Sequence, residues 1–464
     1  MNSKFLNLIS TLSVFFAALT NLPAGEFIVG ADFSHLAFFE DRGIAYKDGG
    51  VSSNALAILK SNGLNCVRLR LFTSSTAQAQ ADPYNYTNNL DYTLPLAVRV
   101  KNAGLQFLLD FHYSDSWADP GKQTKPATWT NLTFIQLEQQ MYVYNSNTLA
   151  AFKAAGALPE YVQIGNEITG GMLWPDGQVS GSYNASWSNL GRLMKAAING
   201  IKDAAGTNAP KIIIHIDRGG DWSTTQWFFD NVVYQNVPFD VIGESYYPWW
   251  HGNLDALSNC LSNAAQRYNK PVIVAETAFP WNNTVPASYN PNLGIPLSPA
   301  GQVEYTIALA SIVKGVPNGQ GVGIFWWGAE YVQLSGYNLA SFQKTSLFDY
   351  GGNALPVLGA YGQLAALRPN YHRPDREQSV AQVAVQRSGN VTPHDNQFCP
   401  ARVLVTRDQC DSKHRRSLQH YPAPWYRAPL LPIAIKLTLA AFRLPILSAA
   451  GPSTFNFQLS TPTP

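Results

Sequence analysis

The sequence is poor in charged residues, which make up 13% of its 464 positions, and it contains four cysteines. A chain with so little charge and 46% apolar residues is neither a charge-rich disordered protein nor a coiled coil, so we expect a large buried core. It has no HExxH motif and no closely spaced group of Cys and His, so we expect no metal and no cofactor. Cys66 lies in an apolar run and is expected to be a buried thiol.

Basic residues are also scarce over most of the chain. Residues 1–371 carry 21 Lys and Arg against 25 Asp and Glu, whereas residues 372–464 carry 11 against 5. A mildly acidic body without a basic stripe argues against nucleic acid as a partner. Beyond about Asn370 the chain is rich in Pro, Arg, Ser and Gln without a sustained period, so we predict that residues 372–464 form an irregular tail rather than a domain.

The first 24 residues contain Lys4, an apolar run from Phe5 to Leu19, and the small-residue exit Leu22-Pro23-Ala24. This pattern is typical of a secretory signal peptide. A transmembrane anchor is the alternative, but the run is shorter than the roughly 20 residues that a span needs and contains polar residues. We expect a secreted, extracellular protein without a membrane partner, whose mature chain begins near Gly25.

Eight short apolar runs recur along the chain, separated by segments with helical patterning. The runs begin at Phe27, Asn65, Leu105, Tyr161, Lys211, Phe239, Pro271 and Gly321. Eight strands that alternate with helices predict an α/β fold, a (β/α)8 TIM barrel formed by residues 25–371. A doubly wound sheet is the alternative, but it needs no eighth strand and usually carries a Gly-rich phosphate loop, which the sequence lacks.

Each run is apolar in its first half and becomes polar or aromatic at its C-terminal end. The C-terminal ends of barrel strands meet at one mouth, where the active sites of this fold lie. The residues expected there are Asp32, Arg68, Arg70, Asp110, His112, Glu167, His215, Asp217, Glu244, Tyr246, Tyr247, Glu276, Trp326 and Trp327.

Two of these positions are glutamates on facing strands. Glu167 follows the fourth run and Glu276 ends the seventh. A pair of carboxyl groups about 5 Å apart can hydrolyse a glycosidic bond with retention of configuration, because one protonates the leaving oxygen while the other attacks the anomeric carbon. A salt-bridged loop carboxylate is the alternative for either residue alone.

The motifs around these ends make the pattern specific. They are GADFS from Gly30, VRLR from Val67, DFHYSDSWADPGKQTKPATW from Asp110, IGNEITGGMLWPDG from Ile164, HID from His215, SYYP from Ser245 and AET from Ala275. Over about residues 30–370 the chain resembles clan A retaining glycoside hydrolases, and within that clan family 53, the endo-β-1,4-galactanases.

The resemblance implies a role for five residues. Glu167 matches the general acid/base and Glu276 matches the nucleophile. Asn166 matches the residue that hydrogen-bonds the sugar 2-hydroxyl, and Arg68 matches the arginine that keeps the nucleophile ionised. Tyr247 matches a tyrosine that contacts the nucleophile, although the adjacent Tyr246 is an alternative for that contact.

The long insert after the third run is polar and aromatic, and we interpret it as a cleft wall. Trp117 and Trp327 are expected to stack on galactose rings, while Asp115, His112 and His215 are expected to hydrogen-bond the sugar rim. The alternative for both histidines is a core position that ties strand ends together.

The sequence departs from the family pattern at three places. Glu244 replaces a usual apolar residue, Gly328-Ala329-Glu330 replaces Glu-Pro after Trp327, and residues 277–279 lack an expected Trp. We expect catalysis to survive, because neither glutamate nor Asn166 is affected.

These observations predict a secreted, monomeric endo-β-1,4-galactanase that cleaves (arabino)galactan side chains of pectin through a covalent galactosyl-enzyme. Another clan A endo-β-glycanase, acting on mannan or a glucan, is the first alternative. A carbohydrate-binding barrel without catalytic activity is the second.

Overall fold

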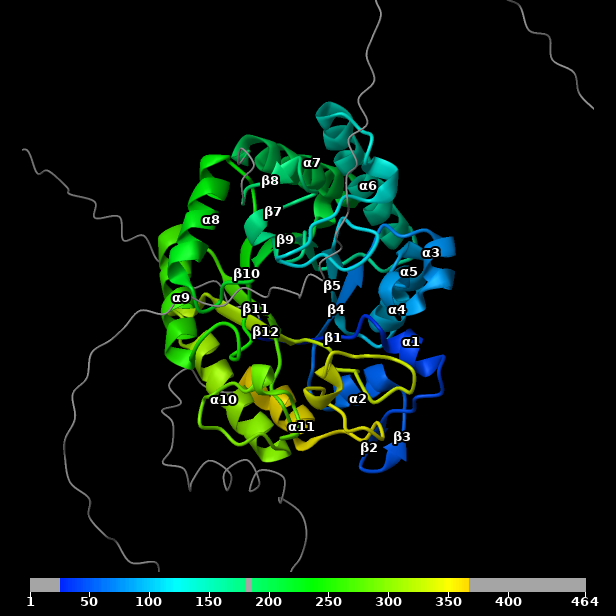
Figure 1. Ribbon diagram of the computed structural model, residues 1–464, viewed down its shortest axis with the longest axis vertical. Coiled ribbons are helices and arrows are strands. Elements are labelled where there is room, and N and C mark those ends of the chain that lie inside the picture. Colours follow the sequence, from blue (N-terminus) through cyan, green and yellow to red (C-terminus); the bar gives the residue numbers. More distant parts are fainter. Residues whose placement is uncertain (1–25, 181–185, 367–464) are drawn as a thin grey trace, which may run out of the picture. The chain divides into compact units, whose positions relative to one another are not determined.

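The computed structural model describes residues 26–180 and 186–366, and within them eight parallel strands close into a barrel (Figure 1). The strand order around the barrel is β1-β12-β11-β10-β9-β6-β5-β4. The strands are β1 (Ile28–Asp32), β4 (Cys66–Leu71), β5 (Gln106–Phe111), β6 (Tyr161–Ile164), β9 (Lys211–Ile216), β10 (Val241–Ser245), β11 (Val272–Thr277) and β12 (Gly321–Trp326). Each arises from one of the eight apolar runs, so the (β/α)8 prediction is confirmed.

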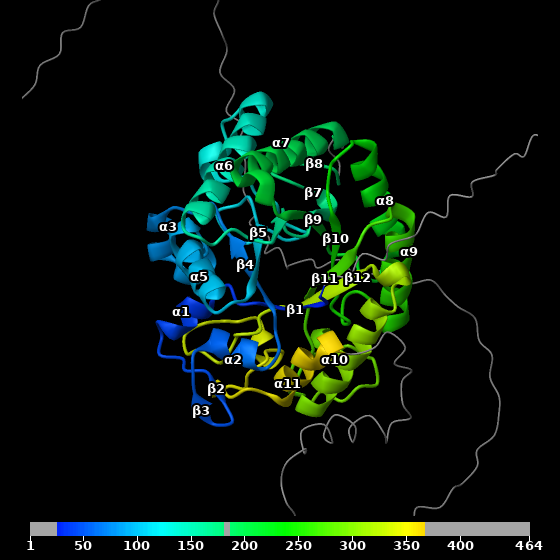
Figure 2. The same ribbon diagram turned by 180° about the vertical axis from the view of Figure 1, so that it is seen from behind.

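Helices surround the strands on all sides (Figures 1 and 2). The larger helices are α5 (Leu90–Asn102), α6 (Phe134–Ala154), α7 (Trp187–Ala205), α8 (Trp222–Tyr234), α9 (Leu254–Tyr268) and α10 (Pro299–Lys314). The shorter ones are α1 (Leu36–Glu40), α2 (Ala55–Ser61), α3 (Thr76–Ala81), α4 (Pro83–Tyr86) and α11 (Pro356–Gly362). Two small hairpins, β2 (Lys47–Asp48) with β3 (Val51–Ser52) and β7 (Gly171–Met172) with β8 (Gly177–Gln178), lie outside the barrel sheet.

Local sequence signals fix where two of the longer helices begin. The Thr133 hydroxyl caps α6 by accepting from the Gln136 backbone N–H, and the Gln136 side chain accepts in return from the Thr133 N–H. This reciprocal arrangement satisfies two N–H groups that a helix start otherwise leaves without partners. Ser298 caps α10 immediately before Pro299, whose fixed φ suits the first helical position.

The barrel interior is filled by an apolar cluster to which seven of the eight strands contribute a buried side chain. Its members are Ile28, Cys66, Leu108, Ile213, Val241, Ile273, Ala275 and Phe325, with Tyr161 of the remaining strand packed against them. Cys66 is a free, buried thiol, as expected. This packed layer forms a floor beneath the polar side chains at the C-terminal strand ends.

The predictions for residues 1–24 and 372–464 lie outside the described residues. Within residues 26–180 and 186–366, no helix combines the length and the apolar character that a membrane crossing requires.

The tight packing of this interior layer can be tested by a substitution at Gly30. A Cβ atom at this position would lie 2.3 Å from two ring carbons of Phe325, which is enclosed by the barrel and cannot move away freely. We therefore expect Gly30→Ala to lower the free energy of unfolding by about 1–3 kcal/mol, measured by denaturant titration.

The control combines Gly30→Ala with Phe325→Leu, which shortens the opposing side chain. If the clash is the cause, the double variant is more stable than the sum of the two single effects implies. Simple additivity would contradict this explanation.

Candidate active site

Glu167 and Glu276 both lie at the mouth of the barrel. Glu276 is in the last part of β11, where Ser245 of the neighbouring β10 is its register partner. Glu167 follows β6 in the left-handed region (φ 50°, ψ 51°), two residues after Gly165, which also has a positive φ of 77°. Left-handed backbone at a side-chain-bearing residue costs about 1–2 kcal/mol. The chain therefore holds Glu167 in place against a backbone preference.

Two donors hold the carboxylate of Glu276. Arg68 Nη2 lies 2.9 Å from Oε1, and the Tyr247 hydroxyl donates to Oε2 over 2.8 Å. The hydroxyl of the adjacent Tyr246 donates instead to the carbonyl of Gly252. Of the two tyrosines, Tyr247 therefore makes the contact with Glu276.

Arg68 is buried and joins several strand ends. It donates to Asp32 Oδ2 over 2.9 Å, to Asp110 Oδ2 over 2.8 Å and to Asn166 Oδ1 over 2.9 Å. Burial disfavours its charge, but Asp110, Glu276 and Asp32 together raise the pKa of Arg68, so it remains a cation.

The two glutamates differ in their electrostatic surroundings. Burial, followed by the charges of Glu276 and Asp217, raises the pKa of Glu167 well above its ordinary value. Burial also raises the pKa of Glu276, to about 7, against the opposing effects of Arg68 and of the Tyr247 hydrogen bond. Because only Glu276 contacts a cation, this arrangement favours an ionised Glu276 beside a protonated Glu167.

The amide of Asn166 is oriented from both ends. Its Oδ1 accepts from Arg68, and its Nδ2 donates to the carbonyl of Ala118 over 2.9 Å. An amide nitrogen has two hydrogens, so one donor remains for a further partner.

His112 and His215 lie beside the carboxylates, but both rings are buried and fully bonded. His112 Nδ1 accepts from the Ala118 N–H over 3.0 Å, and its Nε2 lies 3.1 Å from Asp110 Oδ2. His215 Nδ1 lies 2.9 Å from Gln163 Nε2, and its Nε2 lies 2.8 Å from the Ser245 hydroxyl. No ring nitrogen remains for a sugar, so the geometry favours the alternative in which both histidines tie strand ends together.

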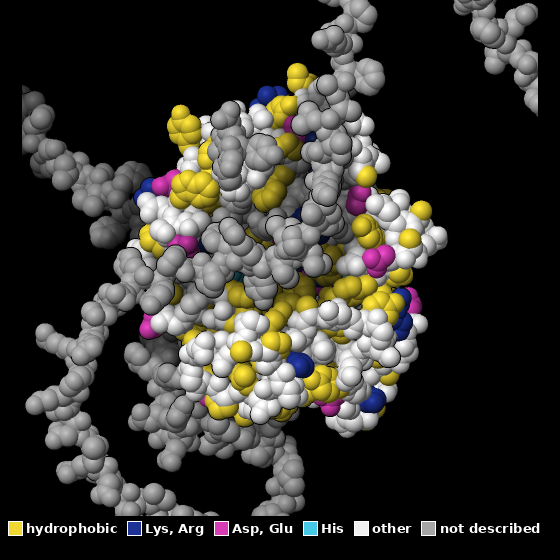
Figure 3. All heavy atoms as spheres, viewed as in Figure 1, with side chains coloured by type: hydrophobic (Ala, Val, Ile, Leu, Met, Phe, Trp, Pro, Cys, Tyr) yellow, Lys and Arg dark blue, Asp and Glu magenta, His cyan; other side chains and the backbone are white. Residues whose placement is uncertain are grey.

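Trp117 and Trp327 lie side by side at the mouth, with ring centroids 6.3 Å apart, and both are half-buried. The Arg70 guanidinium lies 4.2 Å from the Trp117 ring centre, and Phe342 contacts Trp327 with a centroid distance of 4.2 Å. Figure 3 shows hydrophobic side chains gathered in a band across the middle of this face of the barrel. Half-buried indole faces of this kind suit stacking on sugar rings.

Asp115 supports the wall rather than projecting freely. Its carboxylate accepts from the Thr73 hydroxyl over 2.7 Å, from Gln78 Nε2 over 3.2 Å and from the Ala127 N–H over 3.0 Å. These bonds connect the loop after β4, helix α3 and the insert after β5. In this structure the carboxylate stabilises the wall that carries Trp117.

Glu244, the third carboxyl group of this region, does not reach the mouth. It accepts from the Thr225 hydroxyl and from the Arg218 N–H, each over 3.0 Å, and burial raises its pKa well above the ordinary value. The side chain therefore lies against helix α8, outside the carboxylate pair.

Two further residues belong to the site and were not singled out from the sequence. The Ser245 hydroxyl donates to Glu167 Oε1 over 2.7 Å, and Gln163 bonds both Asp110 and His215. Their signal in the sequence was parity, since each alternates with helix-facing residues of its strand and so points into the barrel.

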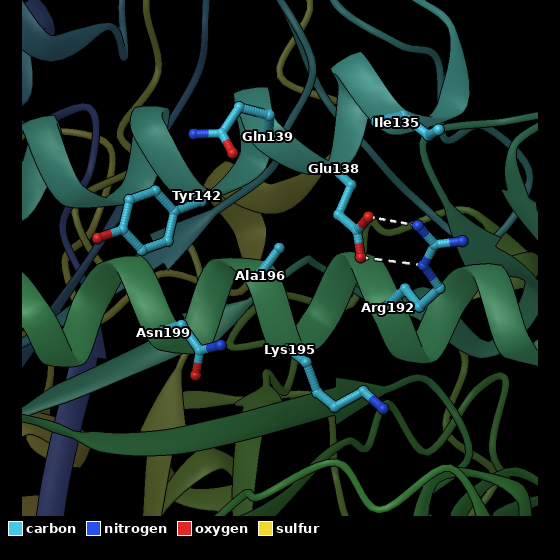
Figure 4. A pocket seen from close by; sticks show the side chains of 8 residues that line it. All are labelled: Ile135, Glu138, Gln139, Tyr142, Arg192, Lys195, Ala196 and Asn199. Atoms are coloured by element: carbon cyan, nitrogen blue, oxygen red, sulfur yellow. Dashed lines mark hydrogen bonds and ion pairs between the residues drawn. The ribbon is translucent and has the colours of Figure 1, made fainter.

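A hollow of about 530 Å³ lies between the outer faces of α6 and α7 (Figure 4). Its wall contains a two-bond ion pair between Glu138 and Arg192. It is lined by Ile135, Glu138, Gln139, Tyr142, Arg192, Lys195, Ala196 and Asn199, and none of these belongs to the carboxylate pair or its partners.

Across residues 26–180 and 186–366, no group of three or more His, Cys, Asp and Glu side chains is arranged to hold a metal ion.

The sequence matches the model of glycosyl hydrolase family 53 over residues 28–361. It is 36% identical over 344 residues to an arabinogalactan endo-beta-1,4-galactanase of Thermothelomyces thermophilus, covering 72% of this chain and 98% of that protein. It is 38% identical over 312 residues to the arabinogalactan endo-beta-1,4-galactanase A of Aspergillus niger, covering 65% of this chain and 85% of that protein.

Solved structures agree with these relatives. A family 53 catalytic domain of Ignisphaera aggregans superposes with a TM-score of 0.67 at 36% identity, covering 74% of this chain and 97% of that one. A fungal beta-1,4-galactanase superposes with a TM-score of 0.64 at 36% identity, covering 72% of this chain and 98% of that one. The chain is thus a glycoside hydrolase, and it belongs to glycosyl hydrolase family 53.

Proposed function

We propose that the protein is an endo-β-1,4-galactanase that hydrolyses (arabino)galactan side chains of pectin by a retaining double displacement. The observation that carries the proposal is the asymmetric pair, in which Glu276 contacts Arg68 and Tyr247 while Glu167 contacts the neutral Ser245 hydroxyl. The names of the similar fungal enzymes support galactan as the polysaccharide.

In the first step, a carboxylate oxygen of Glu276 attacks the anomeric carbon and forms a glycosyl ester. The bond from that carbon to the leaving oxygen breaks, and Glu167 gives its proton to this oxygen. In the second step, the Glu167 carboxylate takes a proton from water, whose oxygen attacks the anomeric carbon and releases Glu276. Two inversions at one carbon give net retention, and both glutamates return to their starting protonation states.

The mouth also offers the contacts that a sugar requires. The remaining N–H of Asn166 is available for the 2-hydroxyl, a bond that strengthens as charge develops in the transition state. Trp117 and Trp327 provide apolar faces on which the rings of a polysaccharide can stack.

The proposal extends to the ends of the chain. In it, residues 1–24 direct export, residues 25–371 form a monomeric catalytic unit, and residues 372–464 are a tail that catalysis does not need. Secretion suits an enzyme whose substrate is a polysaccharide too large to enter a cell.

The substrate is tested with a chain of residues 25–371 supplied with linear β-1,4-galactan, β-1,4-mannan and cellulose. We expect release of reducing ends from galactan at a rate at least about tenfold above that from the other two, because a site built for an axial O4 leaves polar groups unpaired with an equatorial one. Equal rates on mannan or cellulose would favour the alternative of another clan A endoglycanase.

The roles of the two glutamates are tested with Glu167→Ala and Glu276→Ala in the presence of azide. Glu276→Ala should abolish hydrolysis and yield an α-glycosyl azide, because azide replaces the nucleophile. Glu167→Ala should slow polymer cleavage by about 10²- to 10⁴-fold and yield a β-glycosyl azide from an activated substrate. The azide anomers are distinguished by NMR.

Glu244→Gln is the matched control, because it replaces with an amide a buried carboxyl group that lies against α8. It should change thermal stability without changing the activity per folded molecule. Loss of activity in this variant, or the same azide anomer from both Ala variants, would contradict the assignment.

The acid limb of the pH profile of kcat/KM should report ionisation of Glu276, since this carboxylate must be charged to attack. The Tyr247 hydrogen bond lowers the pKa of Glu276 by stabilising its charged form. Tyr247→Phe removes this bond, so the pKa rises and the acid limb moves to higher pH.

Tyr246→Phe is the control, because the Tyr246 hydroxyl bonds a backbone carbonyl instead of Glu276. It should leave the acid limb unchanged. An acid limb that moves to lower pH in Tyr247→Phe, or that moves equally in both variants, would refute the role of Tyr247.

A further inference from the structure

Ser245 connects the proposed acid/base to a buried histidine. Its hydroxyl lies 2.7 Å from Glu167 Oε1 and 2.8 Å from His215 Nε2. Both Ser245 and His215 are completely buried, so neither exchanges these partners freely with water. Ser245 therefore links the carboxyl group of Glu167 to the ring of His215.

Gln163, His215, Ser245 and Glu167 form a chain of hydrogen bonds. The direction of each bond in it can be assigned, beginning at Gln163. The Asp110 carboxylate only accepts, so the Gln163 nitrogen must face it at 2.5 Å, and Arg68 Nε donates to the Gln163 oxygen over 3.3 Å. The same Gln163 nitrogen lies 2.9 Å from His215 Nδ1, closer than it lies to the Gly165 carbonyl oxygen and to Asn166 Oδ1, each at 3.3 Å. An amide nitrogen can donate but not accept. Gln163 therefore donates to His215, and Nδ1 is an acceptor.

The protonation of His215 follows from this assignment. The backbone N–H of Glu167 also points at Nδ1 over 3.4 Å, so two donors meet there. Burial and the charge of Arg68 lower the pKa of His215 well below its ordinary value, so the ring is neutral. A neutral ring with an accepting Nδ1 carries its hydrogen on Nε2, and this hydrogen is donated to Ser245.

Ser245 then has one hydrogen left, and it points at Glu167 Oε1. A proton on Oε1 would face that hydrogen, so the acid form of Glu167 carries its proton on Oε2. Within residues 26–180 and 186–366, Oε2 of Glu167 makes no hydrogen bond, and Glu167 is only half-buried. The oxygen that carries the proton is thus the one free to reach a leaving group.

We propose that Ser245, oriented by His215 and Gln163, is a positioning residue that fixes the transferable proton of Glu167 on Oε2. The inference rests on the proposed function for its catalytic meaning, but the hydrogen-bond chain itself can be measured without substrate. No proton leaves Ser245 in this scheme, since the hydroxyl only orients the carboxyl group that donates.

The hydrogen bond from Ser245 also lowers the pKa of Glu167. Burial, Glu276 of β11 and Asp217 after β9 raise its pKa, whereas the Ser245 hydrogen bond and Arg68 of β4 lower it. Removing the Ser245 hydroxyl leaves the other groups in place and destabilises the charged form. The pKa of Glu167 therefore rises, and the basic limb of the kcat/KM profile moves to higher pH.

Ser245→Ala is the test variant. We expect kcat/KM for galactan to fall about 100-fold, because the proton is no longer held in line with the leaving oxygen. For a 2,4-dinitrophenyl β-galactobioside, whose leaving group needs no proton, kcat/KM should stay close to the wild-type value. Ser245→Thr keeps a hydroxyl and should recover most of the activity on galactan.

Thr225→Val is the matched control, because it also deletes a hydroxyl that donates to a buried carboxyl group, that of Glu244. It should lower stability without moving the basic limb. Equal losses on both substrates in Ser245→Ala, with an unmoved basic limb, would mean that Ser245 is merely structural and would overturn the proposal.

Two NMR measurements test the proposed role of Ser245 without measuring enzymatic activity. In the wild-type protein, the ¹⁵N shifts of His215 should show a hydrogen on Nε2 and none on Nδ1, and the opposite tautomer would overturn the proposal. In protein labelled with ¹³C at the Glu carboxyl carbons, Ser245→Ala should raise the pKa of Glu167. If the wild-type protein cleaves no β-galactoside, the proposed function fails while these measurements still test Ser245.

Discussion

The buried guanidinium of Arg68 is the interaction on which the mouth of the barrel depends. A charge removed from water is stable only when it is paired and hydrogen-bonded, and Arg68 meets this condition through side chains of four other strand ends. Arg68 contacts the carboxyl groups of Asp32, Asp110 and Glu276. The carboxyl group of Glu167 contacts the Ser245 hydroxyl instead of an arginine, and burial together with the charges of Glu276 and Asp217 raises its pKa, so its surroundings favour the protonated form.

Strand alternation explains which side chains reach this cation. On β4, Cys66 belongs to the interior cluster, and Arg68 and Arg70 share its parity. On β10, Val241 is interior, so Ser245 points inward whereas Glu244 points at the helices. Glu276 has the parity of the helix-facing Val274, yet it reaches the mouth because the register of β11 shifts between Val274 and Thr277. The position of the proposed nucleophile thus depends on a local irregularity of the strand.

The barrel could be predicted from the sequence, because its strands are buried on both faces. Such strands appear as continuous apolar runs, of which the first begins at Phe27 and the last at Gly321. The sequence also identified Glu167, Glu276 and Arg68 as candidate site residues, since each lies in a short motif at a strand end. The hydrogen-bond partners of His112 and His215 could not be predicted from the sequence. A histidine that connects strand ends and a histidine that binds a sugar can occupy the same position in a motif. The outward direction of Glu244 follows from the parity of β10, but only once the strand bounds are known.

Asp32 joins the wall of the cleft to the carboxylate pair. Its Oδ2 accepts from Arg68 and its Oδ1 lies 3.4 Å from Arg70, whose guanidinium in turn lies over the Trp117 ring. A cation above an indole face contributes more as water is excluded, and here the guanidinium is buried. Trp117 is therefore coupled through Arg70 and Asp32 to Arg68, which contacts Glu276. A sugar ring that packs against Trp117 and removes its remaining water strengthens the electrostatic interactions beneath it, which is how stacking at the wall can assist chemistry at the strand ends.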